Sequence, residues 1–572
     1  MGVLQKLRKI LDRGTKIRLF IVLVGIIIGA GLEVLALSII SPLISVLLDP
    51  NMVYDNPFIF WVYDFVGFGG TDAFLAFLTF ALAGIYIIRG AYLYLFSKIK
   101  FRFIARRQAM MSNKMMRKIM GFSYIYHANN NGAVLQRTII EDIFNMFSLI
   151  TNLLMMLMEL LMMLFILVFL VIVSPIMTLF VVLLAAICVI LYLKAFRNAI
   201  RVAGQRNRSA HIGMRKTVNQ ALGGIKEVKV LRRETYFSSI FNRFSDVFVK
   251  ENTRFQTLNV LPKLVIEAVC FGGAFALVGF FILVGTDITG IVPQLSVFVL
   301  AAFRLLPAIG RLVSQYNMVV YNLPSVDAVY RNLFEEETRE SNSISTVKPV
   351  DGSGVYVRGL SYEYPNATKS VLNDVNLDIP ENKSVAFVGP SGAGKTTLAD
   401  LILGILTPVT GSIFHKGRIA HNNFDEWGQH IGYIPQQIYL LDETILENVA
   451  FGIDREKIDE DMVWKALEQA QLVEFVKSLP GGLETVVGDR GIRLSGGQRQ
   501  RMGIARALYA DPSILVLDEA TSSLDDDTEK AVMDAIVSLA GKKTMLIIAH
   551  RLSTIEHCDI VYRIENGSVN KL

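Results

Sequence analysis

Long apolar runs fill the first half of this chain and are absent from the second half. Six runs stay apolar over about 18 or more residues, the length that a membrane-spanning helix needs: 17–47, 74–97, 147–174, 177–194, 260–285 and 291–320. From residue 352 on, short β-type runs alternate with helical stretches, which is typical of an α/β nucleotide-binding domain. We therefore predict a membrane domain of six transmembrane helices over 17–335, a polar linker over 336–351 and an α/β domain over 352–572.

The N-terminal segment, 1–16, is basic and has apolar positions at helical spacing. This pattern predicts a short helix lying on the membrane surface, and the alternative is a frayed basic tail. The first apolar run is too long for a signal peptide's apolar region and has no clear cleavage site. We therefore predict that this run is retained as a helix.

Positive charges gather on one side of the predicted spans. The segments 98–146 and 195–259 carry nine and thirteen Lys or Arg residues, whereas 48–73 and 286–290 carry none. Because basic loops stay in the cytoplasm, both termini and the α/β domain are predicted to be cytoplasmic, in a bacterial inner membrane. The net charge of +6 then reflects membrane topology, and we expect no nucleic-acid partner. The three cysteines show no pairing or metal-binding spacing.

A phosphate-binding loop follows the strand-like run 384–388. It consists of Gly389, Pro390, Ser391, Gly392, Ala393, Gly394, Lys395, Thr396 and Thr397, and a helical stretch comes after it. The glycines let backbone N–H groups turn toward phosphates at a helix N-terminus. Lys395 adds a charge for the β and γ phosphates, and the Thr396 hydroxyl can bind Mg²⁺. The loop therefore predicts a site for a nucleoside triphosphate and Mg²⁺.

Two adjacent carboxylates, Asp518 and Glu519, end the apolar run 514–517. Catalytic acids reach the edge of a parallel sheet at the tips of such strands. We expect Asp518 to bind Mg²⁺ and Glu519 to polarise the attacking water. The alternative is an exposed acidic strand end without a catalytic role.

The stretch 494–501, which reads Leu-Ser-Gly-Gly-Gln-Arg-Gln-Arg, resembles the signature of ATP-binding cassettes. The whole of 352–572 resembles such a cassette, an α/β P-loop NTPase. In that family the signature completes a nucleotide site on another copy of the domain, so the resemblance implies a homodimer. A helix N-terminus favours phosphate, and the residues expected to cap the partner's ATP are Ser495, Gly496, Gly497 and Gln498.

The same resemblance implies roles for four further residues. Tyr364 matches the aromatic residue that stacks on adenine. Gln436 matches the glutamine that senses Mg²⁺ and the transport domain. Asp525 lies in the loop that communicates between paired cassettes, and His550 matches the switch histidine near the γ-phosphate. Glu519, Gln436 and His550 are thus the expected catalytic residues, and no essential motif is substituted.

Six spans before one cassette resemble an exporter-type half-transporter with the type IV fold. This resemblance implies ATP hydrolysis coupled to transport across the membrane. It also implies that short helices in the two cytoplasmic loops, around 122–132 and 219–230, dock on the cassettes. The alternative is that both are ordinary loops.

Ionisable residues inside the spans are candidates for substrate contact. Those that are cationic are Arg89, Lys263, Arg304 and Arg311. Arg304 and Arg311 are seven residues apart, hence on nearly one helical face, and an arginine fork suits phosphate. Three alternatives stay open: Arg311 is an interface anchor, Lys263 is neutralised by Glu267, or Arg89 pairs with a glutamate on a neighbouring helix.

The stretches 261–263, 298–311 and 321–327 resemble the fifth and last membrane helices of bacterial flippases for lipid-linked oligosaccharides. Those flippases have an arginine where this chain has Lys263, so the charge is kept but the bidentate fork is lost. The aromatic stretch 56–66 matches a short external helix linked to recognition of the polyprenyl tail. The alternative for this stretch is an aromatic belt at the membrane interface.

The resemblance therefore implies ATP-driven flipping of a polyprenyl-pyrophosphate-linked oligosaccharide from the cytoplasmic to the outer leaflet. Membrane lipids and this substrate are the expected partners, besides a second copy of the chain. One alternative is an exporter of another amphipathic lipid or of hydrophobic drugs. An alternative of another class is an ATP-gated channel or regulator.

Overall fold

The structure, a computed structural model, describes most of the 572 residues. The described ranges are 2–48, 52–55, 57–173, 175–284, 292–334, 350, 352–365, 369–420, 424–488, 491–518, 526–549 and 551–572. The chain divides into two compact units. One comprises Met1–Phe122 and His127–Glu337, and the other comprises Ser123–Tyr126 and Thr338–Leu572. We call them the membrane unit and the cassette unit.

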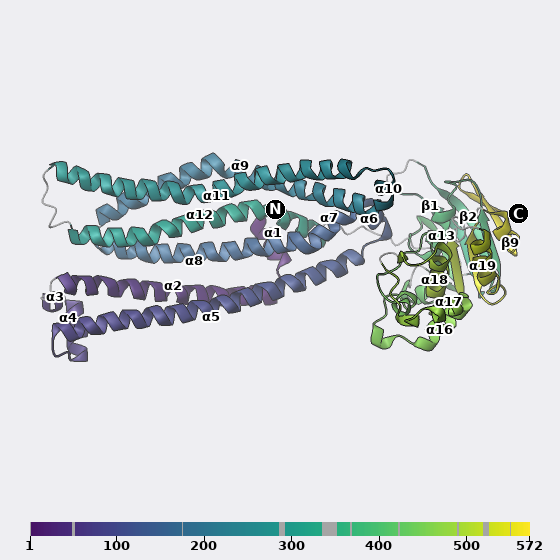
Figure 1. Cartoon of the computed structure of the whole chain (residues 1–572), viewed down its shortest axis with the longest axis horizontal. Helices are drawn as coiled ribbons and strands as arrows, with labels where there is room; N and C mark the ends of the chain where they lie inside the picture. Colours follow the sequence, from purple (N-terminus) through teal and green to yellow (C-terminus); the bar gives the residue numbers. More distant parts are fainter. Residues whose placement is uncertain are drawn as a thin grey trace. The chain divides into compact units, whose positions relative to one another are not determined.

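The membrane unit is built from six long helices that run side by side in pairs (Figure 1). The helix α2 lies along α5, α8 along α12, and α9 along α11. Their bounds are α2 Arg13–Leu48, α5 Thr71–Met120, α8 Ile143–Val173, α9 Pro175–Gly223, α11 Glu234–Val284 and α12 Val292–Phe334. Each of the six spans predicted from the sequence lies along one of these helices, except for residues 174, 285 and 291, which are outside the described residues.

Shorter elements precede or connect the long helices. They are α1 Val3–Ile10, α3 Met52–Asp55, α4 Pro57–Val66, α6 Tyr124–Asn129, α7 Gly132–Arg137, the π-helical η1 Thr138–Asp142, and α10 Ile225–Val230. The elements α6 and α10 lie within the two loop regions for which the resemblance implied docking helices. Within the cassette unit, Ile125 packs against the hydrophobic core.

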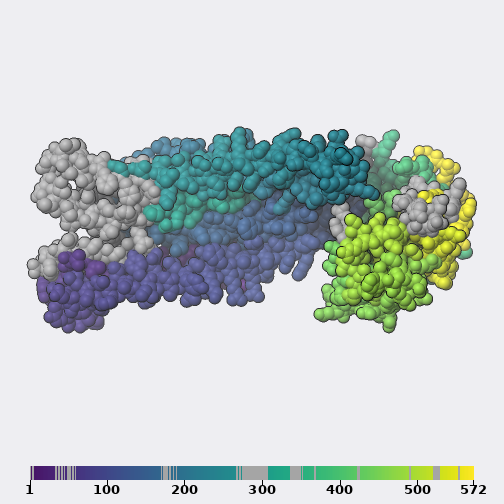
Figure 2. All heavy atoms as spheres, viewed as in Figure 1, coloured from purple at the N-terminus to yellow at the C-terminus, as the bar shows by residue number. Residues whose placement is uncertain are grey.

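Three helical segments among the described residues are long and apolar enough to cross a membrane: Arg13–Leu32, Thr71–Met120 and Gly132–Val168. Their surfaces keep large apolar side chains exposed, such as Phe20, Phe80 and Ile87, of which 65%, 77% and 73% is accessible. Figure 2 shows α2 and α5, in purple and blue, as an uncovered flank of the membrane unit. Helices that face lipid expose apolar side chains in this way.

The cassette unit contains two sheets. The antiparallel sheet has the order β2-β1-β4-β5, formed by β1 Val355–Tyr362, β2 Leu372–Ile379, β4 Thr410–His415 and β5 Arg418–Ile419. The larger sheet has the order β10-β9-β3-β8-β7-β6. Its strands are β3 Ser384–Val388, β6 Ile431–Ile434, β7 Ile514–Asp518, β8 Thr544–Ile548, β9 Ile560–Glu565 and β10 Ser568–Lys571.

The larger sheet is parallel from β9 to β6, and β10 joins β9 as an antiparallel hairpin partner. The strands β3, β7 and β8 are continuous apolar runs, as expected for strands covered on both faces. Parallel pairing brings the carboxyl ends of β3, β8, β7 and β6 to one edge of the sheet, which we call the carboxyl edge.

Helices and short turns complete the cassette unit. Their bounds are α13 Lys395–Leu403, α14 Phe424–Gln429, α15 Ile445–Val449, η3 Arg455–Lys457, α16 Glu460–Gln469, α17 Val473–Ser478, η4 Gly482–Glu484, α18 Gly496–Leu508, α19 Asp526–Val537 and α20 Leu552–Ile555. One hydrophobic core joins the antiparallel sheet, α13 and the larger sheet through Leu360, Leu398 and Val516. A second core lies among α15, α16 and α18 and reaches the larger sheet.

Candidate functional site

The predicted phosphate loop connects β3 to α13 at the carboxyl edge. Gly392 and Gly394 have φ angles of +79° and +103°, in the left-handed region that residues with a Cβ rarely adopt. Gly394 stands at the N-cap of α13, so the helix begins directly after the loop at Lys395. The loop backbone therefore turns at a helix N-terminus, which is the geometry that favours bound phosphate.

Lys395 is almost fully buried, with 5% of its surface exposed. Its Nζ donates hydrogen bonds to the carbonyl oxygens of Gly389 and Pro390, at 2.9 Å and 3.0 Å. These bonds hold the ammonium group over its own loop. The positive charge thus lies where the phosphates of a nucleotide would contact the loop.

Neighbouring side chains of the loop differ in exposure. The Thr396 side chain is exposed, whereas Thr397 is buried and its hydroxyl lies 3.1 Å from the Tyr364 hydroxyl. The Tyr364 ring packs edge-on against Tyr362, with the ring centroids 5.1 Å apart, and 39% of Tyr364 stays exposed. An exposed aromatic face next to the loop suits a stacked base.

Asp518 and Gln436 lie at the carboxyl edge on neighbouring strands. Asp518 ends β7, and Gln436 follows β6, which pairs with β7 in parallel. Gln436 is exposed and Asp518 is half-buried. The structure therefore brings both residues to the edge that carries the phosphate loop.

Asp400, in α13, is a residue of this edge that the sequence analysis missed. Burial, and next the charge of Asp518, raises the pKa of Asp400 to about 6. Two carboxyl groups thus concentrate negative charge beside the phosphate loop, and such an arrangement suits a bound cation. The only sequence signal was one acidic residue in the largely apolar stretch 398–403.

The signature residues form the start of α18. Ser495 is the N-cap: its hydroxyl accepts from the Gln498 N–H at 3.2 Å, and the Gln498 side chain accepts from the Ser495 N–H at 2.8 Å. Ser495 and Gly496 are exposed, and Gly497 is buried. The helix N-terminus therefore presents an accessible serine and glycine at the surface of the cassette unit.

Arg506 attaches α18 to two other segments. Its guanidinium donates to the carbonyl oxygens of Tyr439 and Asn448, at 2.7 Å and 2.8 Å, and lies over the Phe451 ring. Burial lowers the pKa of Arg506 to about 10. This residue, also missed by the sequence analysis, fixes the signature helix to α15 and to the segment after Gln436.

Three predicted site residues, Glu519, Asp525 and His550, lie outside the described residues. Their neighbours indicate where the chain leads. Glu519 follows Asp518 at the end of β7. His550 comes two residues after Ile548, which pairs with Asp518 across β8 and β7. The chain therefore leaves both strands at the carboxyl edge.

Among the predicted substrate residues, Arg311 forms a bidentate ion pair. Its Nε and Nη2 donate to the two carboxylate oxygens of Glu159 in α8, at 2.6 Å and 3.1 Å. Half of the Arg311 side chain remains exposed, against 12% for Glu159. The guanidinium fork that we predicted for a phosphate group is thus occupied by a carboxylate in this structure.

The other three predicted substrate residues are on different helices. Lys263, in α11, has an exposed side chain whose stem lies beside Gly310 of α12. Lys263 and Arg311 are therefore on adjacent helices. The Arg89 guanidinium lies 5.7 Å from the centre of the Tyr86 ring. Arg304 is in α12, and its side chain lies outside the described part of the structure.

A buried charge cluster joins three helices of the membrane unit. The Asp142 side chain is fully buried; it accepts from Arg208 of α9 at 3.1 Å and from the Ser325 hydroxyl of α12 at 2.9 Å. Asp142 lies in η1, and π-helical turns often occur at functional sites. Arg137 and Glu141 extend the cluster.

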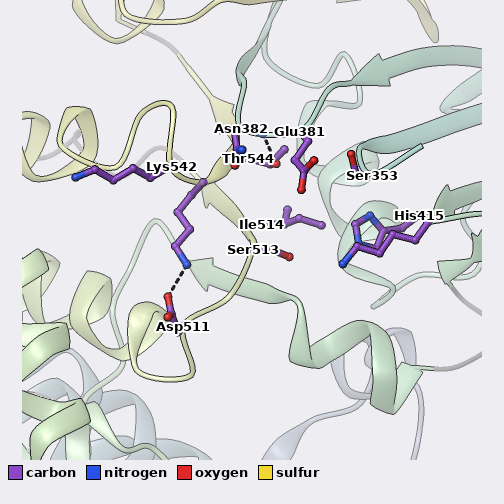
Figure 3. Close-up of a pocket in the computed structure, with 11 residues that line it drawn as sticks. Ser353, Glu381, Asn382, His415, Asp511, Ser513, Ile514, Lys542 and Thr544 are labelled. Atoms are coloured by element: carbon purple, nitrogen blue, oxygen red, sulfur yellow. Dashed lines mark hydrogen bonds and ion pairs between the residues drawn. The ribbon is translucent and has the colours of Figure 1, made fainter. Parts of the chain in front are cut away.

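A polar pocket of about 200 Å³ lies elsewhere in the cassette unit (Figure 3). It is lined by residues that precede or begin β3, β7 and β8, such as Asn382, Ser513 and Thr544. It therefore opens at the amino ends of these strands, opposite the carboxyl edge. Across it, the buried His415 ring donates from Nδ1 to the Gly354 carbonyl at 3.1 Å. This pocket contains none of the predicted nucleotide-binding residues.

Comparison with protein families gives two matches. The model described as ABC transporter matches residues 372–522, and the model described as ABC transporter transmembrane region matches residues 19–303. The first contains the phosphate loop, the signature, Asp518 and Glu519.

Curated relatives include an ATP-dependent lipid A-core flippase of Cupriavidus pinatubonensis. It is 31% identical over 518 residues, which cover 88% of this chain and 85% of the relative. An uncharacterized ABC transporter ATP-binding protein of Bacillus subtilis is 38% identical over 272 residues, covering 47% of this chain and 46% of that protein.

A solved structure of a bacterial Atm1-family ABC exporter with ATP bound has a similar fold. Its TM-score is 0.72 at 23% identity, and the match covers 98% of this chain and 95% of the other. These findings confirm the predicted fold class, a helical exporter-type membrane domain followed by an α/β P-loop domain.

Proposed function

This chain belongs to the ABC transporter family, and we propose that two copies of it form an ATP-driven flippase for a lipid-linked oligosaccharide. ATP hydrolysis coupled to transport is the activity of this family. The polyprenyl-pyrophosphate cargo, its movement from the cytoplasmic to the outer leaflet and the pairing of two identical chains are the proposed parts.

The assignment of an ATPase site is supported by the residues gathered at the carboxyl edge of the larger sheet. We assign contact with the phosphates to Lys395 and the loop N–H groups, and stacking on the adenine to Tyr364. The assignment is supported by Lys395, which is held over the loop, and by the exposed Tyr364 ring. Thr396 and Asp518 fit Mg²⁺, because an exposed hydroxyl and a strand-end carboxylate are oxygen ligands of the kind this ion prefers. Bound Mg²⁺ would neutralise charge on the phosphates.

Hydrolysis requires a group that orients the attacking water. We assign this role to Glu519 and the contact with the γ-phosphate to His550. The assignment is supported by Asp518 and Ile548, which pair at the carboxyl edge and come one and two residues before them in the chain. We assign the third catalytic role to Gln436, two residues after the end of β6. Asp525, beyond Glu519, is assigned to communication between the two cassettes.

Pairing of two chains follows from the signature. Ser495 and Gly496 are exposed at the N-terminus of the 13-residue α18, with Gly497 and Gln498 behind them. Such an N-terminus provides N–H donors and a favourable dipole for the phosphates of a second chain's ATP. On the membrane unit, α10 and its surroundings expose Ile225, Val230 and Leu231, which suits docking on a cassette.

The cargo assignment is supported by the cationic residues of α11 and α12. Lys263 and Arg311 lie on adjacent helices, and Arg311 is half exposed despite its pairing with Glu159. A pyrophosphate would compete with Glu159 for the Arg311 fork, since both groups are bidentate acceptors. Arg304 and Arg89 are the other two proposed contacts.

ATPase assays in nanodiscs test this function. Polyprenyl-pyrophosphate oligosaccharide should stimulate hydrolysis, and the double variant Arg304→Ala, Arg311→Ala should lose the stimulation but keep the basal rate. Arg331→Ala, an exposed arginine later in α12, is the matched control and should behave as the wild type. Equal stimulation by unrelated hydrophobic drugs, unaffected by the double variant, would refute the cargo.

A second candidate is a flippase for lipid A-core, the activity in the name of the Cupriavidus relative. The same assay separates the two candidates. Stimulation by lipid A-core alone would replace the proposed cargo, while leaving the ATPase site and the pairing unchanged.

A further inference from the structure

The N-terminal helix α1 is fastened to α12 by its apolar face and one ion pair. Leu7 and Ile10 are 6% and 3% exposed, and α1 packs along α12. The Lys6 ammonium lies 2.8 Å from a carboxylate oxygen of Asp327 and 5.4 Å from the centre of the Tyr330 ring. The face of α1 that a free surface helix would insert into lipid is therefore covered by protein.

The same segment carries five exposed cations, which we call the basic band: Arg8, Lys9, Arg13, Lys16 and Arg18. The acidic residue within it, Asp12, accepts from Thr15 and lies 3.8 Å from Arg107 of α5. One turn further, Phe20 and Ile21 expose 65% and 62% of their surfaces. Cations thus give way to apolar side chains at the start of a candidate span, Arg13–Leu32.

We propose that the basic band binds the headgroups of anionic phospholipids at this end of α2. The order of cations and apolar side chains places the band at the level of the headgroups when α2 crosses the bilayer. Clustered Lys and Arg next to a span attract anionic lipid, and each contributes roughly fivefold to the affinity for such a surface. The bound lipid is a regulator, distinct from the proposed cargo.

The ion pair between Lys6 and Asp327 connects lipid binding to the ATPase activity. Lipid held by the basic band fixes α1, and α1 is attached to the last turns of α12 through Asp327 and Tyr330. The chain continues from α12 through 335–351 into the cassette. Anionic lipid should therefore raise the ATPase rate through Asp327.

The direct test counts lipids. Full-length protein is purified from mixed phosphatidylcholine and phosphatidylglycerol, and retained lipids are measured by native mass spectrometry, without ATP or cargo. The triple variant Arg8→Gln, Lys9→Gln, Arg13→Gln should weaken phosphatidylglycerol retention by on the order of a hundredfold. The control variant removes three exposed cations of α11 by the substitutions Arg243→Gln, Lys250→Gln and Arg254→Gln. It should retain lipid as the wild type does. Equal retention by both triple variants would overturn the proposal.

The second test measures ATPase in nanodiscs with and without phosphatidylglycerol. Wild type should be stimulated by the anionic lipid, and Asp327→Asn should bind the lipid but lose the stimulation. Full stimulation of Asp327→Asn would overturn the attachment through α12. Because neither readout uses the oligosaccharide, failure of the proposed cargo leaves both tests interpretable.

Discussion

At the scale of single residues, Lys395 and the phosphate loop form one unit. Gly392 and Gly394 have the left-handed geometry that the turn needs, and α13 begins directly after them. Lys395 donates to two carbonyl oxygens of the same loop, so its charge is held at the N-terminus of α13.

We predict that Lys395→Ala lowers the ATPase rate by roughly 10²–10³-fold, the range for removing a donor that stabilises transition-state charge. The measurement is phosphate release by the full-length protein in nanodiscs. The matched control is Lys383→Ala. Lys383 directly precedes β3, the strand that leads to the phosphate loop, so it lies at the amino end of that strand, where it pairs with Asp559. Comparable losses in both variants would contradict the assigned role.

His415 should make stability depend on pH. Burial lowers the pKa of His415, so its stabilising contribution is complete above the unfolded pKa of about 6.5. As the pH falls below that value, the unfolded chain takes up a proton more readily than the folded one, and the contribution is lost.

The thermal midpoint of the wild-type protein should therefore fall between pH 7 and pH 5 more steeply than that of His415→Gln. The exposed His557 provides the control, since His557→Gln should keep the wild-type slope. Parallel pH profiles for the wild type and His415→Gln would contradict this interpretation.

At the scale of elements, the buried charge cluster around Asp142 connects η1, α9 and α12. It joins the pair α8 and α12 to the pair α9 and α11, because Arg208 belongs to α9 and Ser325 to α12. The sequence did not predict the cluster. Asp142 and Ser325 lie 183 residues apart, and no local pattern connects them.

We expect Asp142→Asn to destabilise the protein by about 3–5 kcal/mol, because removing one partner leaves buried arginine charge uncompensated. Thermal unfolding in detergent measures the effect. Asp246→Asn changes an exposed acid of α11 and should cost less than about 0.5 kcal/mol. A small effect of Asp142→Asn would show that water or Glu141 compensates the arginines.

At the scale of the whole molecule, the order of apolar runs was sufficient to predict the two parts of the chain. Apolar length predicts helices, and alternating short runs predict an α/β domain, so the fold class needed no long-range information. The partner of each charged membrane residue did need such information: Glu159 and Arg311 are 152 residues apart, and their pairing depends on how α8 and α12 pack.

Pairing of two chains can be tested by cross-linking. The variant combines Ser391→Cys, Ser495→Cys and Glu519→Gln in a cysteine-free background, and Glu519→Gln serves to prevent ATP turnover. When ATP is bound, a disulfide should form between the cysteine introduced at position 391 of one chain and the cysteine introduced at position 495 of the other. The product is a band of doubled mass on a non-reducing gel. Ser478→Cys, at the end of α17, replaces Ser495→Cys in the control and should give no such band. A cross-link independent of ATP, or none, would contradict a shared site.

The strand order of the larger sheet also has a consequence for how the protein is made. The strand β3, which leads to the phosphate loop, pairs on both sides with β8 and β9, and these begin 160 or more residues later, at Thr544 and Ile560. During synthesis the loop therefore emerges long before its strand has neighbours, and contacts this distant in sequence form slowly. The nascent cassette must wait for β8 and β9, so synthesis that stops before Thr544 would leave β3 as an unpaired, aggregation-prone strand.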